Sequence, residues 1–170
     1  MIRSLGDLVP KIAESAFISE AAYVVGDVEI GENSSVWPGA VIRADFGSIK
    51  IGSNTHIEDN VVLHAAPPFL EIGNDVSIGH GAAVNARKIG NRVLIGMNST
   101  IMHDVEIEGM CVIAGGAVVP QGMKIPSDSF VAGVPATIVK PLTEKQRWWI
   151  QWEGASPYTE MLKQFKRQGL

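Results

Sequence analysis

The segment Ser77–Gly90, which reads SIGHGAAVNARKIG, contains side chains that could bind a metal ion. His80 and Asn85 lie within it, and His64 precedes it in the chain. Imidazole nitrogens are common zinc ligands, whereas an amide oxygen suits harder cations. These residue types predict a metal site that includes His64 and His80. Asn85 stands where a further histidine would bind zinc better.

The positions of these residues in the fold depend on a sequence repeat with a period of six residues. Six is neither a helical period nor the period of a simple strand. It fits short strands joined by turns, in which each strand directs one aliphatic side chain inward and three strands complete one coil of a triangular prism. The aliphatic residues form a first column (Ile12, Ile30, Ile51, Ile72, Ile89, Ile107, Ile125), a second (Ile18, Val36, Ile57, Ile78, Ile95, Ile113, Val131) and a third (Val24, Ile42, Leu63, Val84, Ile101, Val119).

This repeat resembles that of the left-handed hexapeptide β-helix, and the left hand is implied by the resemblance alone. We therefore expect an all-β fold, a left-handed parallel β-helix of about seven coils over residues 1–140. A C-terminal helical tail over residues 141–170 should pack on the prism or on a neighbouring subunit. Each coil is too small to bury its own aliphatic side chains, so the coils must stack.

The tail carries its own signals. Thr143–Gln146 has the sequence of a helix capping box. Gly154 indicates a break, after which Ser156 could cap a second helical piece that begins with Pro157. The tryptophans of the tail are expected to pack this helix onto the prism or onto a neighbouring subunit: Trp148, Trp149 and Trp152.

Departures from the period fall between the third column and the first. Three extra residues follow Ile42 and three follow Leu63, while one is missing after Val84. We expect loops at this corner of the prism, where functional residues often lie. Because adjacent coils are about 4.8 Å apart, Arg43, His64, Asn85 and Met102 should stack there.

His80 should lie elsewhere, two residues after the second column and one coil above Asp59. One side of the prism is roughly 20 Å of extended chain, and a metal ligand must lie within about 2.3 Å of its ion. His64 and His80 of one chain therefore cannot share an ion. They could do so across the subunit contacts of a threefold homotrimer.

Five segments make the chain similar to the γ-class carbonic anhydrases and their relatives: Trp37–Asp45 (WPGAVIRAD), Ile57–His64 (IEDNVVLH), Ile78–Ala82 (IGHGA), Ile95–Met97 (IGM) and Val131–Ala136 (VAGVPA). The resemblance implies a homotrimer that holds zinc or iron(II) between subunits through three histidines, two from one chain and one from its neighbour. His64 and His80 match two of these ligands, and the third position falls on Asn85.

The resemblance implies further roles at the same site. Arg43, Asp45 and Asp59 match residues that form charge pairs across the interface and order the site. Glu58 occupies a position near the metal-bound water where the family usually has glutamine, and it could serve as an anionic ligand or as a base. Tyr158 matches a tyrosine of the tail close to the site.

Hydration of CO2 to bicarbonate is the expected activity, weak or absent because Asn85 replaces a histidine. One alternative is a CoA-dependent acyltransferase with a histidine as base. Another is a trimeric scaffold without catalysis. Asn85 itself could instead be a turn residue in the left-handed conformation. His56 and His103 are expected at solvated turns.

The overall composition narrows the class of protein. The chain has 170 residues, a net charge of −4 and no dense Lys/Arg run before the last few residues. Nucleic acid is therefore not an expected partner. The apolar stretches are too short to span a membrane, and the N-terminus has no run of signal-peptide length. The single cysteine, Cys111, is expected to be a buried, inert thiol in a reducing compartment. We expect a cytoplasmic protein.

Overall fold

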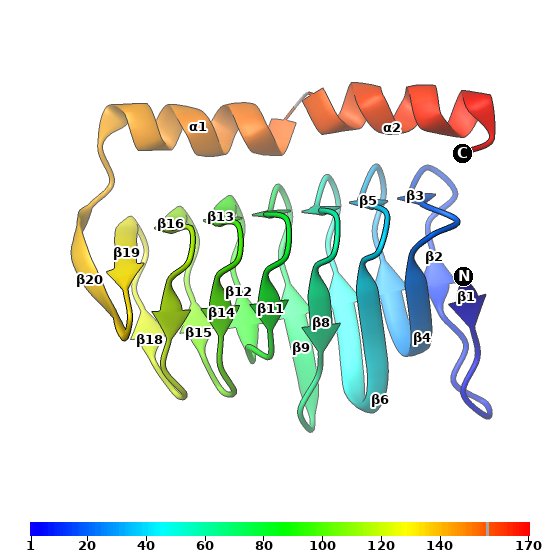
Figure 1. Cartoon of the computed structure of the whole chain (residues 1–170), viewed down its shortest axis with the longest axis horizontal. Coiled ribbons are helices and arrows are strands. Elements are labelled where there is room, and N and C mark those ends of the chain that lie inside the picture. The colour runs from blue at the N-terminus through cyan, green and yellow to red at the C-terminus, as the bar shows by residue number, and fades with distance from the viewer. Residues whose placement is uncertain (156) are drawn as a thin grey trace.

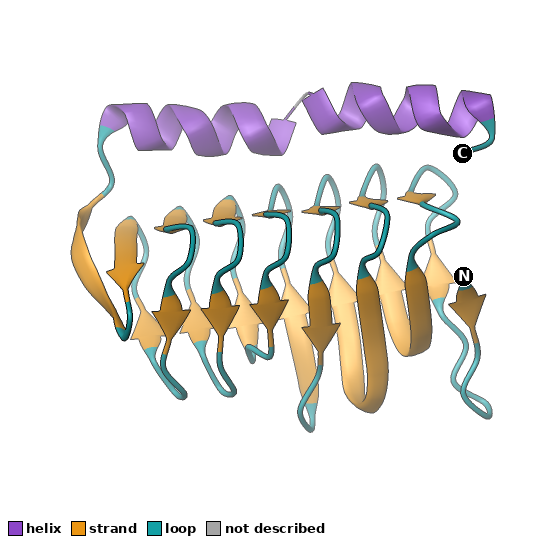
Figure 2. Ribbon diagram, viewed as in Figure 1, coloured by secondary structure: helices purple, strands orange, loops and turns teal. Residues whose placement is uncertain are grey.

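The computed structural model describes residues 1–155 and 157–170, with the side chains of 152–155 left out of the description. The strands form a left-handed parallel β-helix of about seven coils, as predicted (Figures 1 and 2). Two helices follow, α1 (Glu144–Ala155) and α2 (Pro157–Gln168). In both views they run along one long face of the prism.

The strands divide among the three faces according to the three columns. The helices lie along the face built by the second column: β3 (Phe17–Ile18), β5 (Ser35–Val36), β7 (His56–Ile57), β10 (Ser77–Ile78), β13 (Val93–Ile95), β16 (Cys111–Ile113), β19 (Ser129–Gly133) and β20 (Ala136–Pro141). All of its pairings are parallel except that between β19 and β20.

The other two faces belong to one continuous sheet because two long strands pass from one to the other. The sheet contains β1 (Ile2–Arg3), β2 (Lys11–Ile12), β4 (Tyr23–Ile30), β6 (Val41–Ile51), β8 (Val62–His64), β9 (Phe69–Ile72), β11 (Ala83–Val84), β12 (Lys88–Ile89), β14 (Thr100–Ile101), β15 (Glu106–Ile107), β17 (Val118–Val119) and β18 (Lys124–Ile125). The long strands β4 and β6 pair in parallel around the corner, with one register shift.

Stacked aliphatic side chains fill the prism. Pairings between successive coils align residues of the same column, as in Ile57 with Ile78 and Ile78 with Ile95. All predicted column residues after Ile18 are at most 2% exposed, whereas Ile12 and Ile18 of the first coil are partly buried. The predicted core is confirmed, and the first coil is less buried because no coil precedes it to cover that end.

The corner between the third and first columns differs from the prediction at one of its two insertions. The residues after Ile42 continue strand β6 instead of forming a loop. Gly26 makes this possible, since its φ is +91° and a Cβ there would lie 2.0 Å from the carbonyl oxygen of Ala44. After Leu63 the insertion does leave the sheet, between β8 and β9, at the lower edge in Figure 1.

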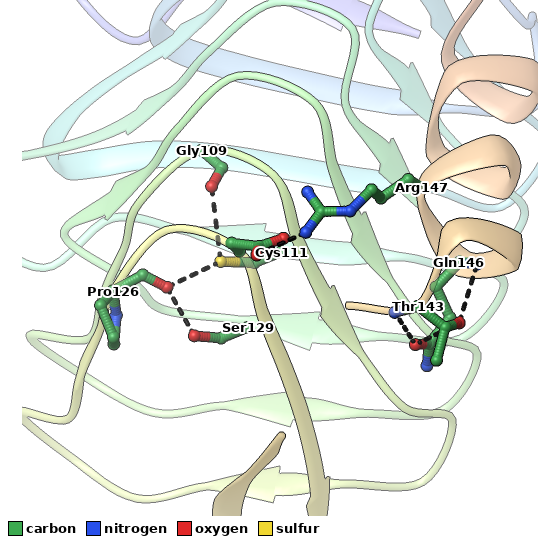
Figure 3. A network of polar contacts seen from close by, with 8 residues as sticks. Gly109, Cys111, Pro126, Ser129, Thr143, Gln146 and Arg147 are labelled. Carbon is green, nitrogen blue, oxygen red and sulfur yellow. Dashed lines mark hydrogen bonds and ion pairs between the residues drawn. The ribbon is translucent and has the colours of Figure 1, made fainter. Parts of the chain in front are cut away.

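Apolar contacts fix the helices to the prism at two separate places. Ile150 of α1 and Leu142 pack with Val112, while Leu162 of α2 packs with Phe17 and Trp37. The capping box is confirmed: the backbone N–H of Thr143 donates to Oε1 of Gln146 at 2.9 Å, and that of Gln146 donates to Oγ1 of Thr143 at 3.3 Å (Figure 3).

The tryptophans are only partly covered by the prism. Trp148 and Trp149 are 55% and 43% exposed, whereas Ile150 of the same helix is buried. Their packing on a neighbouring subunit stays a prediction. The predictions for the side chain of Trp152 and for Ser156 as a cap fall outside the described residues. In the part of the chain that the structure describes, no helix is long and apolar enough to cross a membrane.

Candidate functional site

The first group of polar residues lies on the corner formed by β6 and β8. Arg43 pairs in register with His64, and Val84 pairs with Leu63, so Asn85 follows on the rung above His64 as predicted. Asp45 lies at the centre of the group. Its Oδ1 is 2.9 Å from Nε2 of His64, and its Oδ2 contacts the guanidinium of Arg43.

These contacts determine the charge of Asp45. Burial alone would raise the pKa of this carboxyl, but hydrogen bonds from His64 and Arg43 outweigh it and leave the pKa of Asp45 below its ordinary value. An ionised Asp45 accepts the Nε2–H of His64 and leaves Nδ1 of that ring as the atom with a lone pair. A carboxylate behind one ring nitrogen is the usual arrangement for a histidine that binds metal through the other.

The second group lies on the adjacent face, where β7 and β10 end. Nδ1 of His80 is 3.0 Å from Oδ2 of Asp59, one coil below as predicted, and Nε2 is 3.1 Å from Oε2 of Glu58. The backbone N–H of His80 also donates to Oε2 of Glu58 at 3.1 Å. The side chain of Glu58 is 5% exposed and that of His80 is 44% exposed. A deeply buried carboxylate therefore holds a histidine that faces the surface.

The two groups are separate within one chain. Among the described residues, no three His, Cys, Asp or Glu side chains gather closely enough to hold a metal ion. This agrees with the expectation that His64 and His80 cannot share an ion within one subunit. The charge pairs of Arg43, Asp45 and Asp59 are all made inside the chain, so their pairing across an interface stays a prediction.

The donor set suits a metal ion at two of the three predicted ligands. His64 has a carboxylate, Asp45, against one ring nitrogen, whereas His80 has one against each nitrogen, Asp59 at Nδ1 and Glu58 at Nε2. Asn85 is half-buried and is absent from the described residues with a positive φ, so its alternative explanation as a left-handed turn residue is wrong. Backbone geometry does not account for an asparagine at this position, and the third donor is an amide.

Tyr158 and Glu58 line one pocket, and the expected closeness of the tail tyrosine to a metal ion stays a prediction. The pocket has a volume of about 370 Å³ and lies between the prism and the helices. Its other walls include Leu94, Met97 and the exposed tryptophans Trp148 and Trp149. It is mainly apolar, with the Glu58 carboxylate as its charged group.

His56 contradicts its prediction as a solvated turn residue. It lies in strand β7, is fully buried and stacks on Tyr158 with ring centroids 5.2 Å apart. Its Nδ1 is 2.8 Å from Oγ of Ser35, which accepts a hydrogen bond from Nε1 of Trp37, while Nε2 has no hydrogen-bond partner among the described residues. Burial lowers the pKa of His56 to about 4.

A signal for this burial was present in the sequence. His56 directly precedes Ile57 of the second column, so the alternation along a strand points its side chain out of the prism. That face is the one that the tail covers, and Phe17 occupies the corresponding position on β3. An outward side chain under a helix is buried, whereas the same position on an uncovered face would be solvated.

The remaining single residues agree with their predictions. His103 is exposed in a turn. Cys111 is buried, with Sγ 3.2 Å from the carbonyl oxygen of Pro126 (Figure 3), and burial raises the pKa of its thiol. A neutral thiol without access to solvent is unreactive.

Comparison with known proteins agrees with this architecture. The family model described as "Bacterial transferase hexapeptide (six repeats)" matches residues 10–44 and 88–121. A protein named "Probable carbonic anhydrase" from Methanocaldococcus jannaschii is 43% identical over 136 residues, which cover 79% of this chain and 86% of that protein. The crystal structure of a hexapeptide transferase family protein from Anaplasma phagocytophilum has a TM-score of 0.91 and 31% identity, and covers 95% of this chain and 96% of that one.

A longer plant protein is also similar. Gamma carbonic anhydrase 1, mitochondrial, from Arabidopsis thaliana is 35% identical over 162 residues. The match covers 91% of this chain and 58% of that protein, so the chain spans little more than half the length of this relative. From the repeat, the parallel β-helix and these identities, we conclude that the chain belongs to the γ-carbonic-anhydrase-like family of hexapeptide-repeat proteins.

Proposed function

We propose that the protein is a homotrimer with a metal site at each subunit interface and that it hydrates CO2 to bicarbonate reversibly. His64 and Asn85 of one subunit would face His80 of the next. The contact between Asp45 and Nε2 of His64, at 2.9 Å, carries the proposal because it leaves Nδ1 of that ring for a metal ion, at a corner that also holds Asn85. Similarity to proteins named as carbonic anhydrases supports the choice of reaction.

Each residue has a distinct task in this proposal. Asp45 holds the proton on Nε2 of His64, and Asp59 fixes the ring of His80 through Nδ1. Zinc or iron(II) would supply the acidity that makes water nucleophilic near neutral pH. The pocket between prism and helices would admit CO2 along the apolar side chains of Leu94 and Met97, and Tyr158 would line the inner part of this path.

Asn85 should make the activity weak. An amide oxygen is a poorer zinc donor than imidazole, so a site with two histidines should bind zinc less tightly than one with three. Low occupancy then reduces hydration in proportion. The proposal therefore concerns a weak enzyme whose metal content limits its rate.

The proposal is tested on untagged protein, since a histidine tag could supply a ligand. Light scattering should give three times the chain mass at micromolar concentration. Chelator competition should detect zinc binding with one ion per chain, and stopped-flow measurements should detect slow CO2 hydration after loading with zinc or iron(II). A monomer that binds no metal would contradict the shared site.

Acyl transfer from CoA is a second candidate, supported by the name "hexapeptide transferase family protein" of the Anaplasma relative. The pocket volume of about 370 Å³ is at the lower end of the range for small-molecule sites. A thermal-shift titration separates the candidates, because a ligand stabilises the folded state that binds it. If the protein is a transferase, CoA should raise its melting temperature. If it is the metal protein, zinc should do so. If it is a scaffold, neither ligand should change the melting temperature.

A further inference from the structure

Glu58 and His80 form the pair of side chains from which a further role can be inferred. Oε2 of Glu58 lies 3.1 Å from Nε2 of His80, and the same oxygen accepts the backbone N–H of His80. The carboxylate is 5% exposed. Among the described residues, its ion pair is with His80 and not with a lysine or arginine. Burial of a carboxylate in this way is costly unless a cation compensates its charge.

The spacing of the two atoms is close to that of two ligands on one ion. Donor atoms that each lie about 2.0–2.2 Å from a tetrahedral zinc ion are roughly 3.3–3.6 Å apart. Nε2 and Oε2 are 3.1 Å apart, so a small separation of the two side chains would bring both to a shared ion. On the far side of the ring, Asp59 is 3.0 Å from Nδ1 of His80 and fixes its orientation. The pair thus approaches the donor spacing of a metal site and has its supporting carboxylate.

We propose that Glu58 is itself a metal ligand and that the complete set is Glu58 and His80 of one subunit with His64 of its neighbour. This inference rests on the proposed intersubunit site and changes its composition. Two imidazoles and one carboxylate form a recognised donor set for catalytic zinc and for non-haem iron(II). Asn85 is then not required as a ligand.

The contacts of Glu58 hold one of its oxygens in a fixed position beside His80, although the side chain also lines the pocket. In the described residues, Oε2 of Glu58 is occupied by two groups of His80, and the side chain is almost fully buried. The same burial favours a ligand, since a carboxylate fixed before binding needs little reorganisation.

Glu58→Gln tests the proposal because it removes the charge and keeps the shape. Zinc affinity is measured by chelator competition on untagged trimer, in the parent and in an Asn85→His background. We expect Glu58→Gln to weaken zinc binding at least tenfold in the parent. In the Asn85→His background, where a third imidazole is present, the loss should be less than about threefold.

Controls separate this result from a general loss of structure. Asp104→Asn removes a carboxylate from an exposed ion pair away from the site, 2.9 Å from Arg87, and should leave zinc affinity unchanged. If Glu58→Gln does not fold, Glu58→Asp keeps the charge but shortens its reach, and zinc binding should still weaken at least tenfold. Circular dichroism and light scattering establish that each variant is folded and assembled.

The outcomes distinguish the inference from the proposed function beneath it. Glu58 would be refuted as a ligand if Glu58→Gln lowered zinc affinity equally in both backgrounds, or did not lower it in the parent. In either case, zinc binding by the Asn85→His trimer would still support the intersubunit site. If neither the parent nor the Asn85→His protein bound zinc, the intersubunit site and the role of Glu58 would both be refuted.

Discussion

His56 should make the stability of the protein sensitive to moderate acid. Its ring is fully buried between Ser35 on β5 and Tyr158 on α2, and no side chain or backbone group that the structure describes bonds to Nε2. A proton added to this ring would place an uncompensated charge beneath the helix. The perturbation is therefore a shift from pH 7 to pH 5, compared between the parent and His56→Gln, which cannot titrate.

The magnitude follows from the pKa of His56, which burial lowers from 6.5 to about 4. The unfolded chain binds this proton more readily than the folded chain does. The free energy of unfolding therefore has its full value above pH 6.5 and decreases as the pH falls toward 4. The full effect is about 3 kcal/mol, of which about 2 kcal/mol is lost between pH 7 and pH 5. The lowered pKa of Asp45 affects stability only below its ordinary value of 3.8, outside this interval.

Urea unfolding at fixed protein concentration measures the effect. The parent should lose about 2 kcal/mol more than His56→Gln between pH 7 and pH 5. His103→Gln is the matched control, since an exposed ring meets solvent in both the folded and the unfolded chain, and it should behave as the parent does. If His56→Gln lost as much stability as the parent, the ring would already be solvated and the buried arrangement would be wrong.

Three further changes test other parts of the structure. Asn85→His should raise zinc affinity at least tenfold, about 1.4 kcal/mol, in chelator competition, and equal affinities would show that residue 85 does not face the metal. Arg43→Ala should cost less than about 1 kcal/mol of monomer stability in urea unfolding, because its pair with Asp45 is partly exposed. The same variant should dissociate at lower salt in light scattering if Arg43 contacts a neighbouring subunit. Ile95→Ala should cost about 2–5 kcal/mol in urea unfolding, since this side chain is fully buried in the middle coils.

The coils could be predicted from sequence because each column position has the same physical requirement. An inward side chain must be aliphatic and of constant size, so the same residue type occurs at the equivalent positions Ile57, Ile78 and Ile95. The continuity of β6 could not be predicted in this way. It depends on a close approach between the backbones at Gly26 and Ala44, which follows from the bend of the neighbouring coil.

The site was predictable to the extent that it follows register. The stacking of Asp59 below His80 and of His64 above Arg43 follows from counting residues between columns. Burial of His56 and exposure of Trp148 could not be obtained by counting. Both depend on the rotation of the tail helices over the prism, which is set by packing of Ile150 and Leu162.

Charge gives a reason to consider positions 58 and 85 together. In the His64 group, Arg43 compensates Asp45, so that corner has no excess negative charge. In the His80 group, two carboxylates face one imidazole and no arginine or lysine pairs with them among the described residues. The excess negative charge therefore lies on the His80 side of the proposed interface. On the other side of the proposed interface, position 85 offers an amide, which is a weak zinc donor. A cation shared by the two subunits would satisfy the carboxylates and be held despite the weak amide, which is why the effects of Glu58 and Asn85 on affinity should depend on each other.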